Sequence, residues 1–106
     1  MVVSISIKVW YKDDYYESYE FNLINCDTNN ASKVIKKLGF NVSNDSTYDS
    51  LITFEKQLSN GFTLSGTVED NIEYDSLTLI IANSREICNF ILESILKGII
   101  EKVSKY

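Results

Sequence analysis

The stretch Ser84–Tyr106, SREICNFILESILKGIIEKVSKY, decides the fold because it predicts one long amphipathic helix. Its apolar residues form two neighbouring stripes at helical spacing, made of Ile87, Phe90, Ile91, Ile95 and Ile99 in one and Leu92, Leu96, Ile100 and Val103 in the other. Together they cover about half of the helix circumference, whereas a helix that packs on a core usually needs an arc of roughly 100°. The surplus predicts that part of this helix contacts a partner.

The first half of the chain predicts a hairpin and a short helix. Residues alternate between apolar and polar along Val3–Val9, as is typical of a half-buried strand. A polar turn separates this strand from a second one, Tyr15–Asn25, and the close spacing indicates an antiparallel hairpin. Asn29 or Asn30 can then cap a helix over Ala31–Leu38, which Gly39 ends.

The middle of the chain predicts a second hairpin and a last strand. Asn60-Gly61 is the residue pair of a type I′ turn, with apolar alternation on both sides over 52–58 and 62–68. The strand Leu77–Ala82 follows an acidic turn, and Ile80 makes it apolar on both faces, as expected at the centre of a sheet. We therefore predict one α+β domain, residues 1–106, with the order β-β-α-β-β-β-α: an antiparallel sheet of about five strands with the long C-terminal helix packed on one face.

The residue types argue against an enzyme. The chain has no histidine, which removes the commonest general base and the commonest zinc ligand. Its four glycines are widely separated, so no glycine-rich phosphate loop is present. We expect no catalytic residues, no metal site and no cofactor.

The chain shows neither a signal peptide nor a membrane segment, and these absences predict a cytoplasmic domain. Cys26 and Cys88 follow no metal spacing, and free thiols are the expectation in a reducing compartment. A disulfide between them stays open at this point, because only their separation in the fold decides it.

The charge balance limits the partners. Ten basic and fifteen acidic side chains give a net charge of −5, so direct binding of duplex nucleic acid is not expected. An alternative is a small viral-type inhibitor that mimics nucleic acid through the acidic, tyrosine-rich segment Tyr11–Glu20 and downstream carboxylates. The carboxylates of this alternative are Asp13, Asp14, Glu17, Glu20, Glu69, Asp70, Glu73 and Asp75. A third alternative is a ligand-binding module with a pocket between the sheet and the last helix.

Association with a protein partner, or with a second copy, is the leading hypothesis. The chain has no proline, so no sheet edge is protected by that residue. Gly98 lies inside the predicted helix, where glycine is unfavourable unless another backbone approaches closely. The residues predicted to bind a partner are Ile87, Ile91, Ile95, Gly98, Ile99 and Trp10.

The last segments resemble a known family. Leu77–Ser84, LTLIIANS, followed by Leu92–Leu96, LESIL, is similar to the last strand and last helix of the small Pcc-type subunits of the KEOPS complex, which makes threonylcarbamoyl-adenosine in tRNA. Glu93 stands where the family favours asparagine, and Asn89 where it favours arginine. The resemblance implies a divergent, non-catalytic accessory subunit that pairs with another Pcc-type chain and docks on a transferase subunit.

Overall fold

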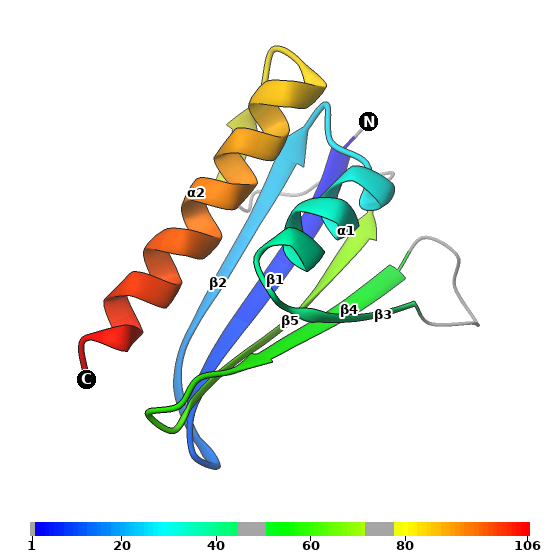
Figure 1. Cartoon of the computed structure of the whole chain (residues 1–106). Helices are drawn as coiled ribbons and strands as arrows, with labels where there is room; N and C mark the ends of the chain where they lie inside the picture. Colours follow the sequence, from blue (N-terminus) through cyan, green and yellow to red (C-terminus); the bar gives the residue numbers. More distant parts are fainter. Residues whose placement is uncertain (1, 45–50, 72–77) are drawn as a thin grey trace.

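The computed structural model describes residues 2–44, 51–71 and 78–106 as one sheet covered by two helices (Figure 1). The elements in chain order are β1 (Val2–Tyr11), β2 (Asp14–Ile24), α1 (Thr28–Lys37), β3 (Asn41–Asn44), β4 (Leu51–Gln57), β5 (Phe62–Asp70), β6 (Thr78–Ile81) and α2 (Arg85–Ser104). The strand order across the sheet is β3-β4-β5-β1-β2-β6. The predicted α+β class and the long helix packed on the sheet are confirmed.

The sheet differs from the predicted one in two details. Among the described residues it has six strands, where about five were predicted, because the short strand β3 pairs with β4. Its sequence, Asn41–Asn44, has a single apolar residue and therefore no alternation to reveal it. The sheet is also mixed, because β6 pairs parallel with β2 while the other neighbours are antiparallel.

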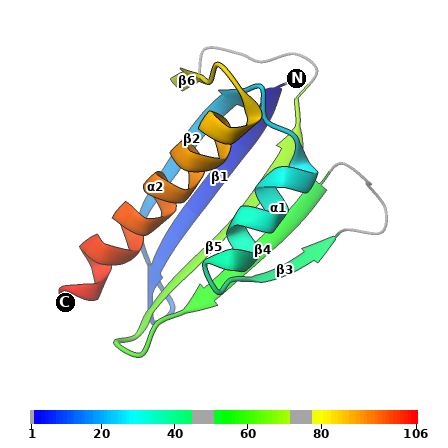
Figure 2. The ribbon, with the colours of Figure 1, turned by 45° about the horizontal axis from the view of Figure 1, so that its top comes forward.

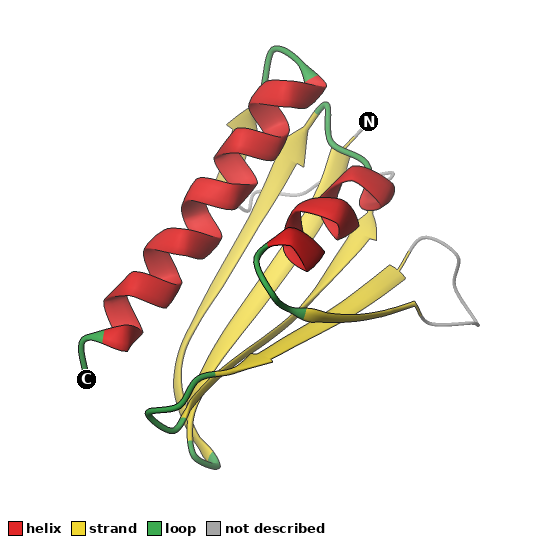
Figure 3. Cartoon of the chain, viewed as in Figure 1, coloured by secondary structure: helices red, strands yellow, loops and turns green. Residues whose placement is uncertain are grey.

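Both helices pack on the same face of the sheet, with α2 along β2 and α1 beside it (Figures 2 and 3). Alternate residues of each long strand point toward the helices; in β1 these are Val3, Ile5, Ile7 and Val9, all at most 2% exposed. Among the described residues, no helix covers the other face of the sheet, which we call the open face (Figure 3). Within the described residues, no helix is both long and apolar enough to cross a bilayer.

The start of α1 differs from the prediction, whereas its end is as predicted. Asp27 is the N-cap, and its side chain accepts a hydrogen bond from the backbone N–H of Asn30 at 2.7 Å, so the helix begins at Thr28. Asn29 and Asn30 lie inside the first turn instead of capping it. Gly39 has φ +88° just after the helix, the conformation that a C-terminal glycine supplies.

The predicted type I′ turn at Asn60-Gly61 is wrong. Gly61 has φ +95°, but Asn60 does not have the positive φ that a type I′ turn requires. Leu58 and Phe62 instead close a three-residue loop through a 2.8 Å hydrogen bond from N–H to C=O. The side-chain oxygen of Asn60 accepts a hydrogen bond from the N–H of Phe62 at 3.2 Å within the loop, while its amide nitrogen donates to the end of α2.

The strand β6 lies at an edge of the sheet, not at its centre. It pairs with β2 over Phe21–Ile24 and has no described neighbour on its other side. Both of its faces are apolar, although the strand does not lie between two other strands and its residues Leu79 and Ile81 are exposed. The predicted first residue of this strand, Leu77, and the acidic residues Glu73 and Asp75 lie outside the described residues.

Candidate functional site

The beginning of α2 is held by the connection between β2 and α1. Asn25, which has φ +66°, donates from its side chain to the carbonyl oxygen of Ala82 in the turn before α2. Asp27 lies 3.6 Å from the guanidinium group of Arg85. Ser84 is the N-cap of α2 and accepts a hydrogen bond from the N–H of Ile87 at 3.2 Å. These contacts fix the direction in which α2 leaves β6.

A disulfide between Cys26 and Cys88 strengthens this attachment, so the expectation of free thiols is wrong. The Cα atoms are 5.8 Å apart, in the usual range for a disulfide, and both residues are fully buried. Because 62 positions separate them, no sequence spacing could show that the β2–α1 connection packs against the first turn of α2. Disulfides are typical of oxidising compartments and of intracellular proteins from hyperthermophiles.

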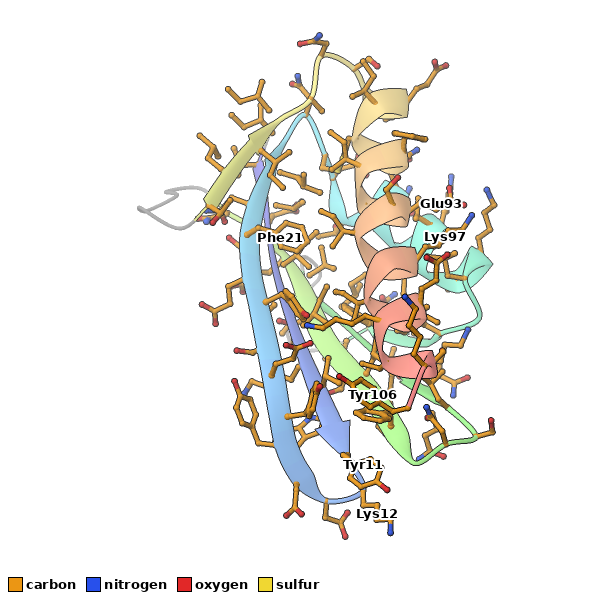
Figure 4. All side chains as sticks on the ribbon, turned by 90° about the vertical axis from the view of Figure 1, so that its left-hand side faces the viewer. Tyr11, Lys12, Phe21, Glu93, Lys97 and Tyr106 are labelled. Atoms are coloured by element: carbon orange, nitrogen blue, oxygen red, sulfur yellow. A yellow bond between two sulfur atoms is a disulfide. The ribbon has the colours of Figure 1, made fainter. Side chains whose placement is uncertain are left out.

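The end of α2 is held by the hairpin between β4 and β5. Asn60 donates from its side chain to the carbonyl oxygens of Val103 at 2.8 Å and Tyr106 at 3.2 Å. The ring of Tyr106 packs on Phe62 with a centroid distance of 5.7 Å, and its hydroxyl lies 3.2 Å from that of Tyr16. Figure 4 shows Tyr106 at this end of the molecule, close to Tyr11. α2 is therefore anchored at both ends.

Polar contacts identify the two flanks of α2. On one flank Glu93 forms ion pairs with Lys97 at 3.0 Å and with Lys37 of α1 at 3.4 Å, so this flank faces α1. The neighbouring Lys97 and the pairing with Lys37 hold the pKa of the Glu93 carboxyl below its usual range. On the other flank Lys102 lies 2.9 Å from Glu17 of β2, so this flank faces β2.

The contact between Lys102 and β2 includes a tyrosine. Tyr19 donates a hydrogen bond to Glu17, and Lys102 donates to the hydroxyl of Tyr19 at 3.3 Å. These hydrogen bonds, first that of Tyr19 and then those of Lys102, lower the pKa of Glu17. The carboxylate of Glu17 in turn raises the pKa of Lys102, and burial together with Glu17 raises the pKa of Tyr19. In the first half of β2, around Glu17 and Tyr19, polar groups therefore make the contact with α2.

Farther up the same flank, toward the beginning of α2, the side chains are apolar. Steps of three and four residues connect Lys102 with Gly98, Ile95, Ile91 and Ile87. These residues therefore share one side of the helix. Ile87 is 41% exposed, and Ile91 and Ile95 are half-buried at the border of the core. A Cβ atom added at Gly98 would meet no atom within 4 Å. Four of the predicted partner residues thus lie together, and Gly98 does not mark a helix crossing within this chain.

The strand β6 extends this apolar flank around the edge of the sheet. Ile80 pairs with Leu23 and faces the helices, whereas Leu79 and Ile81 face the open side. Ile81 is 67% exposed and Leu79 is 38% exposed. Phe90, which is 70% exposed, lies on another side of α2, because steps of three and four residues lead from it to Glu93 and Lys97. Figure 4 views this side, with β6 and α2 on either side of β2. We call these residues the edge surface: Leu79, Ile80, Ile81, Ile87, Ile91, Ile95 and Gly98.

The other two predicted partner residues lie elsewhere. Ile99 is 5% exposed and belongs to the core, because it falls on the side of α2 that carries the buried Leu92 and Leu96. Trp10 lies on the open face, where its indole N–H donates to the hydroxyl of Ser65 at 3.2 Å and its ring packs against Tyr15. Neither residue is part of the edge surface. The residues that sequence reasoning missed are those of β6, whose apolar character on both faces was a usable signal.

The acidic residues of the inhibitor alternative do not share one surface. Asp13 and Asp14 lie at the tip of the β1–β2 hairpin, and Glu17 faces the helices and is bound to Lys102. Glu20 and Glu69 lie on the open face, where they flank Ser4 and Ser6 of β1. Tyr11, Tyr15 and Tyr16 of the hairpin each pack against a neighbouring ring but stay partly exposed, at 41%, 60% and 39%.

A hollow lies on the open face, not between the sheet and α2. It has a volume of about 820 Å³ and spans β1, β5, β4 and β3. Its walls are mainly polar, with side chains such as Lys8, Thr53, Glu55, Ser65 and Thr67. Between the sheet and α2, in contrast, Leu23, Leu92 and Leu96 fill the space and are fully buried. The predicted pocket beneath the last helix is therefore not observed among the described residues.

In the described ranges, no group of three or more histidine, cysteine, aspartate or glutamate side chains could hold a metal ion. No family model, no curated protein and no solved structure matches the chain. The edge surface therefore has to be interpreted from its own chemistry.

Proposed function

We propose that this protein is a non-catalytic interaction subunit that associates through its edge surface. The observation that carries the proposal is the exposure of large apolar side chains on two elements consecutive in the chain, with Ile81 67% and Ile87 41% exposed beside a strand edge that has no partner among the described residues. Apolar groups at an unprotected edge favour association, because pairing buries them and satisfies the free backbone groups of the strand.

The anchoring of α2 supports this proposal. The disulfide at Cys88 and the hydrogen bonds from Asn60 fix both ends of the helix. An interaction surface on a fixed element loses little conformational entropy when a partner binds, so a larger part of the apolar burial contributes to affinity. The edge surface is thus held ready for a partner.

The resemblance to Pcc-type KEOPS subunits supplies one setting for such a subunit. In that setting the partner is another Pcc-type chain or a transferase subunit, and the location is cytoplasmic. The motif residues Leu92 and Leu96 are fully buried here, so core packing explains them without a partner. The proposal therefore rests on the edge surface and holds for any protein partner.

A pair of surface variants tests the proposal. Ile81→Asp places a charge in the edge surface, and Tyr15→Asp, at a residue that is 60% exposed near the far end of β2, is the matched control. We expect the wild type and Tyr15→Asp to associate, with themselves or with a partner recovered from the native cell, while Ile81→Asp does not. Sedimentation velocity and affinity capture measure association, and circular dichroism checks folding. A wild type that stays monomeric and captures nothing sensitive to Ile81→Asp refutes the proposal.

A further inference from the structure

We propose that the partner of the edge surface is a second copy of this chain, bound by antiparallel pairing of the two β6 strands about a twofold axis. The inference rests on the proposed function and specifies its partner. Its starting point is the contrast between the two edges of the sheet, β3 and β6.

The two edge strands differ in what they offer to another strand. β3 is polar, with Asn41, Ser43 and Asn44 exposed and only Val42 apolar. β6, Thr78–Ile81, is apolar after its first residue and contains no charge, proline or glycine. Charged residues, prolines and bulges are the usual devices that keep a strand edge from pairing, and β6 has none of them among its residues. The edge at β6 is therefore the one suited to pairing.

A strand edge is complementary to itself in the antiparallel sense. Two copies of β6 related by a twofold axis exchange the same N–H and C=O groups, so a single sequence satisfies both sides. Because paired residues point to the same face, Leu79 and Ile81 of the two copies would meet on the open face. Ile80 would then face the helix layers of both copies. The sheet would continue through both copies.

The same axis brings the two α2 helices together. Since both helices lie on the face toward which Ile80 points, the flanks carrying Ile87, Ile91 and Ile95 approach one another across the axis. Gly98 lies on this flank with open space around it, so a neighbouring helix meets no side chain at that position. Helices that pack together are about 8–10 Å apart, a separation that small residues help to reach. Pairing of strands and packing of helices thus act in one interface.

The charge of the surface favours a second copy over an oppositely charged partner. The chain has a net charge of −5, and most acidic surfaces of two copies would repel each other. The edge surface contains only Leu79, Ile80, Ile81, Ile87, Ile91, Ile95 and Gly98, none of them charged. Two copies can therefore meet here without placing like charges in contact. A stable interface takes about 800 Å² from each partner, roughly an eighth of the 6471 Å² of this chain.

Hydrogen exchange combined with sedimentation tests the pairing. We expect a dimer whose amides in β6 exchange at least tenfold more slowly at high protein concentration than at low concentration, while those of β3 do not change. Ile81→Lys should abolish both the dimer and this protection, whereas Ser43→Lys, the matched change on the other edge strand, should alter neither. Circular dichroism of both variants establishes that they are folded.

The outcomes separate this inference from the proposed function. A monomeric wild type that binds a different protein, with binding lost in Ile81→Asp, overturns the homodimer but leaves the interaction subunit standing. A dimer that survives Ile81→Lys, or whose β6 amides show no dependence on concentration, overturns the strand pairing. A monomer without any partner sensitive to Ile81→Asp overturns both.

Discussion

Lys102 of α2 donates hydrogen bonds to both carboxylate oxygens of Glu17 in β2, at 2.9 and 3.0 Å. This contact turns one flank of the helix toward the edge of the sheet. The pair lies at the first half of β2, whereas β6 pairs with β2 only over Phe21–Ile24. The apolar side chains of the same flank of α2 therefore lie on the side of β6. The position of the edge surface is thus linked to one ion pair.

The Glu17–Lys102 pair predicts a contribution to stability that depends on pH. The pKa of Glu17 is lowered in the folded protein, so its contribution is present above the ordinary glutamate pKa of about 4.3 and is lost as pH falls through the lowered value. In the Glu17→Gln variant, the free energy of unfolding should therefore fall less steeply as the pH is lowered. Urea denaturation between pH 6 and about pH 2 measures it, with Glu20→Gln on the open face as the control. An unchanged acid slope in Glu17→Gln contradicts the assignment.

The disulfide predicts a large effect of reduction. The closed loop spans 62 positions, for which chain entropy gives a stabilisation of about 4 kcal/mol. The double variant Cys26→Ala with Cys88→Ala should lower the free energy of unfolding by about that amount, as should full reduction of the wild type. Denaturation with and without a reductant measures both effects. If the reductant shifts the double variant as much as the wild type, the effect does not come from this disulfide.

The elements with local signals were predictable from the sequence, and those that depend on distant partners were not. The apolar periodicity of α2 and the alternation in β1 reflect neighbouring residues, so they predicted the helix and the strand correctly. The parallel pairing of β6 with β2 and the disulfide join segments far apart in the chain, and no local pattern encodes them. Asn60 combines both kinds of contact, because its side-chain oxygen accepts from the N–H of Phe62 in the loop and its amide nitrogen donates to Val103 at the end of α2.

The candidate site was predictable to the same extent. Helical spacing placed Ile87, Ile91, Ile95 and Gly98 on one flank, and the structure keeps them together. Ile99 belongs to the same helix but to its buried side, a distinction that depends on how α2 is rotated over β2. That rotation buries Cys88, Leu92, Leu96 and Val103, and it agrees with the Lys102–Glu17 contact and with the anchors at the helix ends, which lie outside the helix pattern.

Replacing Gly66 of β5 or Gly98 of α2 by alanine should change the stability of the monomer in opposite directions. A Cβ atom at Gly66 in β5 would lie 2.5 Å from the ring of Phe54 and would also clash with the backbone of Ser6. Gly66→Ala should therefore destabilise the fold by about 1–3 kcal/mol or more, because neither neighbour has room to move. Gly98→Ala meets open space within a helix and should stabilise the monomer by up to about 1 kcal/mol.

Thermal denaturation measures both glycine variants. If Gly98→Ala stabilises the isolated chain but weakens association, another backbone approaches this position in the complex. A destabilised Gly98→Ala monomer would show that the helix is not free at this position. A stable Gly66→Ala variant would contradict the close packing of Phe54 over β5.

The response of association to salt separates the edge surface from the acidic-mimic alternative. Apolar burial contributes roughly 25 cal/mol per Å² and does not depend on ionic charge, whereas charges at a surface are screened within about 8 Å at physiological ionic strength. We expect the dissociation constant to change less than about threefold between low and high salt. The combined variant Asp13→Asn, Asp14→Asn and Glu20→Gln should bind as the wild type does. Ile87→Asp, at a residue 41% exposed, should weaken binding severely without unfolding the chain.

Single substitutions are preferred to a truncation of α2 after Gly98, because a truncation would also remove Ile99 and Val103 from the core. Sedimentation equilibrium at several salt concentrations gives the dissociation constants. The opposite pattern would be binding that is lost at high salt and in the neutralised variant but persists in Ile87→Asp. That pattern would assign the interaction to the acidic hairpin, and the apolar edge surface would then have no role in recognition.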